Sequence, residues 1–114
     1  MNNIQRERNE VLRLLNPMKK KHLSPSFQSS RANSHLHESM KFDVWFSHFK
    51  MGHSVLTEAV FVSGGRADIL CLDDRLIIEI VVTEKEESLI KKKGIYPSEL
   101  DFQVIPGGKN GRVT

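Results

Sequence analysis

The chain has 114 residues and a mass of 13.0 kDa, which suits one domain, or one domain with an arm. Hydrophobic residues make up 39% of it and charged residues 27%, which excludes collagen-like and disulfide-framework proteins and leaves a folded protein with a modest core. Cys71 is the single cysteine, and no apolar run approaches the ~20 residues of a membrane span, so we expect a cytoplasmic, intracellular protein without a secretory signal.

Residues 2–15 are predicted to form a short helix that ends before Pro17. Residues 24–34 are rich in serine and are interpreted as a linker. A second helix follows, with Ser34 as its N-cap and Gly52 at its end. Its aromatic side chains recur at the spacing of one helical face, which predicts the main packing surface of the protein. These aromatic residues are Phe42, Trp45, Phe46 and Phe49.

Three strand-like runs come next, separated by turn residues. They cover residues 55–62, 66–72 and 76–82. Thr83 and Glu86 then have the spacing of a capping box, which opens a helix that ends before Gly94. A last strand is predicted at residues 101–105. The fold class is therefore α/β: an αβββαβ sandwich with a mixed sheet, in which a final strand pairs parallel to an antiparallel meander.

Basic residues are concentrated near the start of the chain. Residues 1–34 carry seven Lys or Arg against two Glu, whereas the rest carries ten against twelve Asp or Glu. A basic arm joined to a mildly acidic body favours contact with a polyanion such as DNA, and a solvated leader is the alternative. Lys19, Lys20 and Lys21 are the chief candidates for binding phosphates. We expect an arm and linker over 1–33, a folded domain over 34–106 and a loose tail over 107–114.

Two acidic residues fall on neighbouring predicted strands. If the second and third strands form a hairpin centred on Asp73 and Asp74, Asp68 stands directly opposite Glu79. Their Cβ atoms would then be ~4.5–5.5 Å apart on one face, an unfavourable arrangement for like charges unless a cation neutralises them. Glu38, on the buried side of the second helix, points to the same end of the sheet.

Three carboxylates from a helix and a hairpin are the oxygen ligands that Mg²⁺ or Mn²⁺ prefers, and such an ion assists phosphodiester hydrolysis. The alternative is that each acid is local, with Glu38 paired to Lys41 and Asp68 to Arg66. Glu79 would then bond a backbone group or the basic arm. Glu58, on the first strand, is a possible fourth acid.

These residues resemble the PD-(D/E)XK nuclease superfamily, in particular its small archaeal and viral members that are similar to Holliday junction resolvases. The matching text is Glu38, the run Gly-Gly-Arg-Ala-Asp-Ile-Leu at 64–70 and the run Ile-Ile-Glu-Ile-Val at 77–81. The resemblance covers about residues 34–105. It implies a restriction-endonuclease-like fold, a metal held by Glu38, Asp68 and Glu79, cleavage of DNA and a homodimer.

The family normally carries a catalytic lysine two residues after the strand glutamate, and this chain has Val81 there. Some members supply that lysine from another element, and Lys85 and Lys92 on the following helix are the candidates. For Lys92 a solvent-facing helical charge, in reach of a DNA backbone, is the preferred interpretation, and Arg66 is a further candidate for nucleic-acid contact. A nuclease fold without catalysis, acting as a nucleic-acid-binding or interaction module, therefore stays open as the alternative function.

A zinc site is not expected. His48 and His53 straddle the end of the second helix, and the chain has one cysteine and no CxxC motif. Cys71 lies in an apolar strand, where a cysteine normally packs rather than reacts. Of the five histidines, His35 is the best placed to approach a phosphate, because it precedes Glu38 by three residues.

Overall fold

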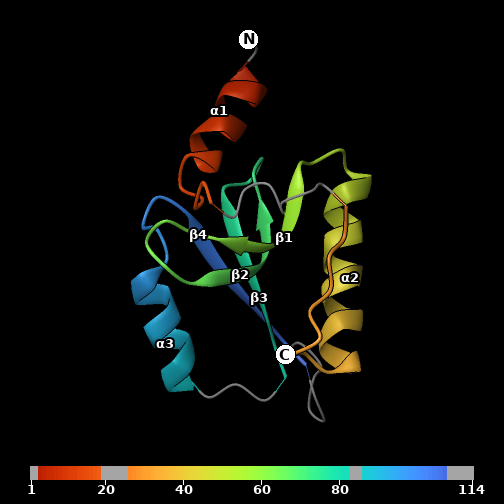
Figure 1. Ribbon diagram of the computed structural model, residues 1–114. Helices are drawn as coiled ribbons and strands as arrows, with labels where there is room; N and C mark the ends of the chain where they lie inside the picture. Colours follow the sequence, from red (N-terminus) through yellow and green to blue (C-terminus); the bar gives the residue numbers. More distant parts are fainter. Residues whose placement is uncertain (1–2, 19–25, 83–85, 108–114) are drawn as a thin grey trace.

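The computed structural model describes residues 3–18, 26–82 and 86–107. Lys19, Lys20, Lys21 and Lys85, as well as the Thr83 cap and the tail from residue 108, lie outside the described residues. Within the described part of the chain, three helices accompany one four-stranded sheet (Figure 1). No helix there is long and apolar enough to cross a membrane.

The helices and strands follow one another in the predicted order. They are α1 (Asn3–Leu12), α2 (His35–Lys50), β1 (Val55–Val60), β2 (Arg66–Cys71), β3 (Leu76–Val81), α3 (Glu86–Ile95) and β4 (Asp101–Pro106). The strands lie in the order β1-β2-β3-β4, antiparallel except for β4, which runs parallel to β3. The predicted α/β fold, with a meander and a parallel last strand, is therefore confirmed.

The sheet has a hydrophobic cluster on each face. Helix α2 covers one face, where Trp45 packs on Ile69 and Ile78. On the opposite face, Leu70 and Ile77 pack with residues of α1 and of the segment after α3. Figure 1 shows α2 and α3 on opposite sides of the sheet. Because residues 77 and 78 alternate between the two clusters, β3 is buried on both faces, as its almost wholly apolar sequence predicts.

The start of the chain belongs to the core, which corrects the expected boundary at residue 34. Val11 and Leu15 are 0% and 1% exposed and join the cluster on the α3 side of the sheet. Leu15 also forms a β-bridge with Phe61. The Arg8 guanidinium donates to Asp73 at 2.8 Å, which ties α1 to the β2–β3 turn. The excess of basic residues predicts an arm, but Val11 and Leu15 of this segment are fully buried.

Replacing Leu15 by alanine is expected to lower the free energy of unfolding by about 2–4 kcal/mol, because the truncation opens a cavity in the core. Ile4 on α1 is 57% exposed and serves as the control, since Ile4→Ala is expected to change stability by less than about 0.5 kcal/mol. Urea denaturation of both variants measures the difference. Equal, small effects would restore the interpretation of residues 1–33 as an independent arm.

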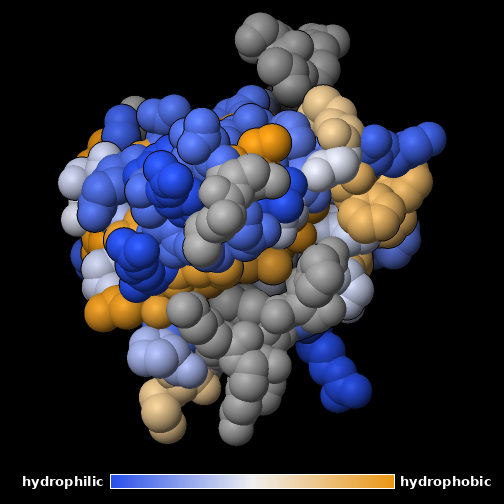
Figure 2. All heavy atoms as spheres, turned by 90° about the horizontal axis from the view of Figure 1, so that it is seen from above, coloured by the Kyte–Doolittle hydropathy of each residue, from blue (hydrophilic) through white to orange (hydrophobic). Residues whose placement is uncertain are grey.

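Helix α2 is turned relative to its prediction. Its N-cap is as expected, since the Ser34 hydroxyl accepts a hydrogen bond from the His37 backbone N–H at 3.1 Å. Of the predicted aromatic face, however, only Trp45 is buried, and the three phenylalanines are 41–49% exposed and contact one another on the surface. Seen from above, hydrophobic residues gather at the surface on the α2 side (Figure 2).

The side chains that α2 directs toward the sheet have the spacing 3, 4, 3. They are Glu38, Lys41, Trp45 and His48. The buried face is therefore rotated by about 70° from the aromatic one, less than the ~100° step between successive residues, and Trp45 belongs to both faces. Lys41 is 0% exposed and takes the place that the prediction gave to Phe42. Burial of a lysine is tolerated only where opposite charges contact it. Glu38 and Glu58 contact Lys41 in the site described next.

Candidate active site

The β2–β3 hairpin has the predicted register. Ile69 pairs with Ile78 and Leu70 with Ile77, which places residue 68 across from residue 79. The backbone ladder stops at that level and side chains continue it. The Asp68 backbone N–H donates to Glu79 Oε2 at 2.8 Å, and the Ile80 N–H donates to Asp68 Oδ2 at 2.9 Å. Each carboxylate thus takes the place of a backbone carbonyl as acceptor. The two acids therefore help to hold β2 and β3 together at this level.

The two carboxylates nevertheless turn to different sides of the sheet. Asp68 Oδ2 faces α2 and lies 3.2 Å from His37 Nε2. Glu79 Oε1 faces α3 and lies 3.0 Å from Lys92 Nζ and 3.1 Å from the Tyr96 hydroxyl. Asp68 and Glu79 therefore lie opposite each other as predicted, but their carboxylates do not share one face of the sheet.

An interruption of the side-chain alternation in β1 and β2 explains this difference. Leu56 of β1 and Leu70 of β2 lie in the cluster on the α3 side, and so do Ala59 and Ala67, three positions away in each strand. Regular alternation would put residues three apart on opposite faces. The break falls between them at Glu58, whose φ of 57° lies in the left-handed region that side chains other than glycine rarely adopt. The distortion turns the Glu58 and Asp68 carboxylates toward α2.

Lys41 lies between two carboxylates. Its Nζ donates to Glu38 Oε1 at 3.1 Å and to Glu58 Oε2 at 3.0 Å. It also lies 5.2 Å from the centre of the Phe27 ring. Arg66, which is exposed, approaches the other oxygen of Glu58 at 3.7 Å. The predicted local pair of Glu38 and Lys41 is thus present, as part of a larger network that joins α2 to β1.

Glu38 is held by protein donors on both oxygens. Besides Lys41, the donors are the Ser30 backbone N–H at 2.7 Å, the Asn33 side-chain amide at 3.1 Å and His37 Nδ1 at 3.0 Å. Burial acts to raise the pKa of Glu38, but these hydrogen bonds together hold its pKa below the usual value. Glu38 is therefore ionised and fully engaged, and it reaches Asp68 through the His37 ring rather than directly.

Glu79 is 1% exposed. Burial raises its pKa, and the negative charge of Asp68 raises it further, against the effects of the Asp68 N–H and of Lys92. The Lys92 contact corrects the preferred sequence interpretation, in which this lysine faced solvent. A lysine from α3 thus reaches the strand glutamate, although Val81 occupies the position where the resembled family carries its lysine.

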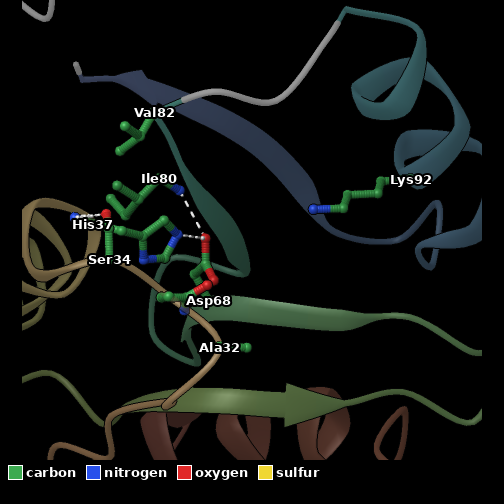
Figure 3. Close-up of a pocket in the computed structure, with 8 residues that line it drawn as sticks. Ala32, Ser34, His37, Asp68, Ile80, Val82 and Lys92 are labelled. Carbon is green, nitrogen blue, oxygen red and sulfur yellow. Dashed lines mark hydrogen bonds and ion pairs between the residues drawn. The ribbon is translucent and has the colours of Figure 1, made fainter. Parts of the chain in front are cut away.

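A solvent-filled pocket of about 380 Å³ opens beside Asp68. Its lining residues are Ala32, Asn33, Ser34, His37, Asp68, Ile80, Val82 and Lys92. Figure 3 shows His37 and Asp68 pointing toward one another, while Lys92 extends toward them from α3. Among the described residues, hydrogen bonds and ion pairs engage Asp68 Oδ2 and leave Oδ1 without a partner. This oxygen is the acidic group that the pocket offers to a ligand.

Asp68 and Lys92 line this pocket, Glu79 contacts both without lining it, and His37 joins Glu38 to Asp68. His37 and Lys41 are functional candidates that sequence reasoning missed. His35 was expected to be the histidine best placed to approach a phosphate, but it is His37, next to Glu38 in the chain, whose ring contacts both Glu38 and Asp68 beside the pocket. The available signal was the sequence neighbourhood of Glu38, where both a histidine and a lysine occur within three residues.

A separate group of potential metal ligands lies at the other end of α2. Within the described residues, His48, His53, Cys71 and Asp74 place one ligand atom each within 4.8 Å of one another, whereas Glu38, Asp68 and Glu79 do not converge in this way. Burial raises the pKa of the Cys71 thiol to about 11, which agrees with the expectation that it is not a nucleophile.

No family model, curated protein or solved structure matches this chain. The assignment of a function to the pocket therefore depends on its chemistry.

Proposed function

We propose that this chain is a metal-dependent nuclease that hydrolyses phosphodiester bonds in DNA, and that its fold is restriction-endonuclease-like. The observation that carries the proposal is that Asp68 and Lys92 line one open pocket and both contact the buried Glu79. The order of α2, the meander, α3 and β4 supports the fold assignment, since it agrees with the core that the family resemblance implies.

The donor set suits Mg²⁺ or Mn²⁺. Both ions prefer carboxylate oxygens, and Asp68 offers one such oxygen that is free of partners among the described residues. Glu79 adds a second carboxylate, whose charge Lys92 offsets only in part because the lysine is itself 38% exposed. When bound, such an ion polarises a phosphodiester and favours ionisation of the attacking water. Asp68 would hold it at the pocket, and Glu79, which faces α3, would have to turn toward Asp68 to join it, while Glu38 is engaged elsewhere.

The remaining residues position these groups. Lys92 holds Glu79 and presents a positive charge to the pocket, where it can stabilise negative charge that develops on a phosphate. His37 fixes Asp68 through one ring nitrogen and Glu38 through the other. Lys41 neutralises Glu38 and Glu58, so that the acidic site is compatible with burial.

The excess of positive charge in residues 1–34 supports a polyanionic substrate. Contacts of this kind are mainly with the phosphate backbone, so binding should be sensitive to salt and only weakly dependent on sequence. The homodimer implied by the family resemblance stays a prediction that sedimentation of the full chain can check.

The test is cleavage of labelled four-way junction, duplex and single-stranded DNA with Mg²⁺ or Mn²⁺, beside an EDTA control. Cleavage should require the metal and should fall at least about 10²-fold in Asp68→Asn, because the amide removes a ligand charge from the pocket. Asp43→Asn, at an exposed position of α2, is the matched control and should cut normally. Cutting that persists in EDTA, or that is equal in both variants, would contradict the proposal.

A binding module on the same fold is the second candidate. It is favoured by Val81 at the usual lysine position and by the protein donors that fill both oxygens of Glu38. Salt-dependent binding of DNA without cleavage in either metal would select it.

A further inference from the structure

Four side chains of different elements converge where α2 ends. They are His48 of α2, His53 of the following turn, Cys71 of β2 and Asp74 of the β2–β3 turn, and we refer to them as the His/Cys/Asp cluster. The two histidine Nδ1 atoms lie 3.2 Å apart, and the Cys71 sulfur lies 3.5 Å from His53 Nδ1. Asp74 Oδ2 lies 3.7 Å and 3.8 Å from the Nδ1 atoms of His48 and His53.

These separations are those of a tetrahedral metal site. Zinc binds histidine nitrogen at about 2.0–2.1 Å, carboxylate oxygen at about 2.0–2.2 Å and thiolate sulfur at about 2.3 Å, so ligand atoms at tetrahedral angles lie about 3.3–3.8 Å apart. The four measured distances run from 3.2 to 3.8 Å. All the ligand atoms lie within 4.8 Å of one another, so small shifts of side chains would bring the four atoms to tetrahedral spacing around a zinc ion.

Hydrogen bonding alone does not account for the convergence. His53 Nδ1 carries at most one proton, yet an imidazole nitrogen, a sulfur and a carboxylate oxygen all lie within 3.8 Å of it. One proton satisfies one of these contacts and leaves the other atoms facing one another. A cation at the centre would accept a lone pair from every member of the cluster.

Backbone contacts that leave the ligand atoms free hold the cluster in place. Gly52, with φ of 83°, allows the chain to reverse after α2, and the His53 N–H returns to the His48 carbonyl at 3.2 Å. The Leu72 N–H donates to the Ser54 carbonyl at 2.9 Å. The Ser54 N–H donates to Asp73, which Arg8 of α1 also binds. Support of ligands by neighbouring hydrogen bonds is a regular property of metal sites.

We propose that the His/Cys/Asp cluster is a structural Zn²⁺ site that fastens the end of α2 to the β2–β3 hairpin. Two nitrogens, one sulfur and one oxygen form a donor set of intermediate softness, which suits zinc and not the Mg²⁺ of the pocket. Four protein ligands close the coordination sphere, as in structural rather than catalytic sites. The site is independent of the proposed nuclease function, because it shares no residue with the pocket.

The test uses the full chain, freed of metal with a chelator and then titrated with Zn²⁺ against a competing chelator. We expect one zinc per chain and a rise in melting temperature on binding. Co²⁺ should replace zinc and give the absorption bands of a tetrahedral site together with a thiolate-to-cobalt charge-transfer band. His53→Ala and Asp74→Asn, at side chains that are 23% and 46% exposed, should each weaken zinc binding by about 10²-fold or more.

Two controls separate this site from the rest of the molecule. His35→Ala changes an exposed histidine of the same helix, and Asp68→Asn changes the pocket, and both should bind zinc as the wild type does. Equal zinc binding by wild type and His53→Ala, or loss of zinc in Asp68→Asn alone, would overturn the proposal. Absence of the thiolate band from the wild-type cobalt spectrum would overturn it without any variant. Failure of DNA cleavage would not affect it.

Discussion

Replacing Lys41 by alanine is expected to lower the free energy of unfolding by about 3–5 kcal/mol, the cost of breaking a buried ion pair by removing one partner. Lys41 is 0% exposed and donates to both Glu38 and Glu58. Without it, two carboxylates face each other across a cavity, and among the described residues only the exposed Arg66, 3.7 Å from Glu58, and His37, beside Glu38, carry basic groups near them. Chemical denaturation at constant pH measures the loss.

Two further variants make the Lys41 prediction specific. Lys50→Ala removes an exposed lysine of the same helix and is expected to change stability by less than about 0.5 kcal/mol. Adding Glu58→Gln to Lys41→Met should recover part of the lost stability, because it removes one of the uncompensated charges. A small effect of Lys41→Ala, similar to that of Lys50→Ala, would show that the network does not hold α2 to β1.

The second large effect concerns activity and depends on the proposed nuclease function. Lys92→Ala is expected to lower kcat for DNA cleavage by about 10²–10³-fold, the usual cost of removing one group that stabilises charge in the transition state. Lys92 has this effect because its ammonium group reaches Glu79 and the pocket. Single-turnover cleavage in saturating Mg²⁺ measures the change without a contribution from DNA affinity.

Lys91 and Lys93 are matched controls for Lys92, since both are exposed neighbours on α3. Lys91→Ala and Lys93→Ala remove the same charge from the helix, so they should weaken DNA binding at most slightly and leave single-turnover cleavage unchanged. If all three variants lose cleavage equally, Lys92 acts only through the charge of the helix. If Lys92→Ala retains full cleavage, Lys92 does not replace the catalytic lysine that the resembled family carries near the strand glutamate.

Part of the candidate site could be predicted because it depends on local pattern. The apolar strands and the Asp73-Asp74 turn predict the hairpin register, and this register brings Asp68 and Glu79 to the same level of the sheet. Turn length and alternation specify strand register, so such a prediction needs no knowledge of the rest of the fold. The N-cap at Ser34 is local in the same sense.

The rotation of α2 could not be predicted from hydrophobic spacing. The aromatic residues form the more obvious apolar face, yet only Trp45 of them is buried against the sheet, and Lys41 is buried beside it. The lysine is acceptable in the interior only because Glu58 meets it, and Glu58 points toward α2 only because its backbone is left-handed. Neither condition leaves a signal in the sequence around α2.

The metal expectations were limited in the same way. Zinc was not expected because no two candidate ligands have a familiar spacing in the chain. The His/Cys/Asp cluster draws its ligands from a helix end, a strand and a turn that meet only in the folded molecule. Lys92 was likewise assigned to solvent because its own helix does not reveal that Glu79 lies beneath it.

The sequence by itself determined the class of fold, the order of its elements, the hairpin register and the level at which two acids meet, because these follow from short-range alternation, caps and turns. Only the tertiary structure decided which face of α2 is buried, which lysine reaches the acids and which histidines meet Cys71. These outcomes depend on pairs of opposite charges from elements far apart in the chain. Such pairs form, and contribute to stability, only once the elements are packed together.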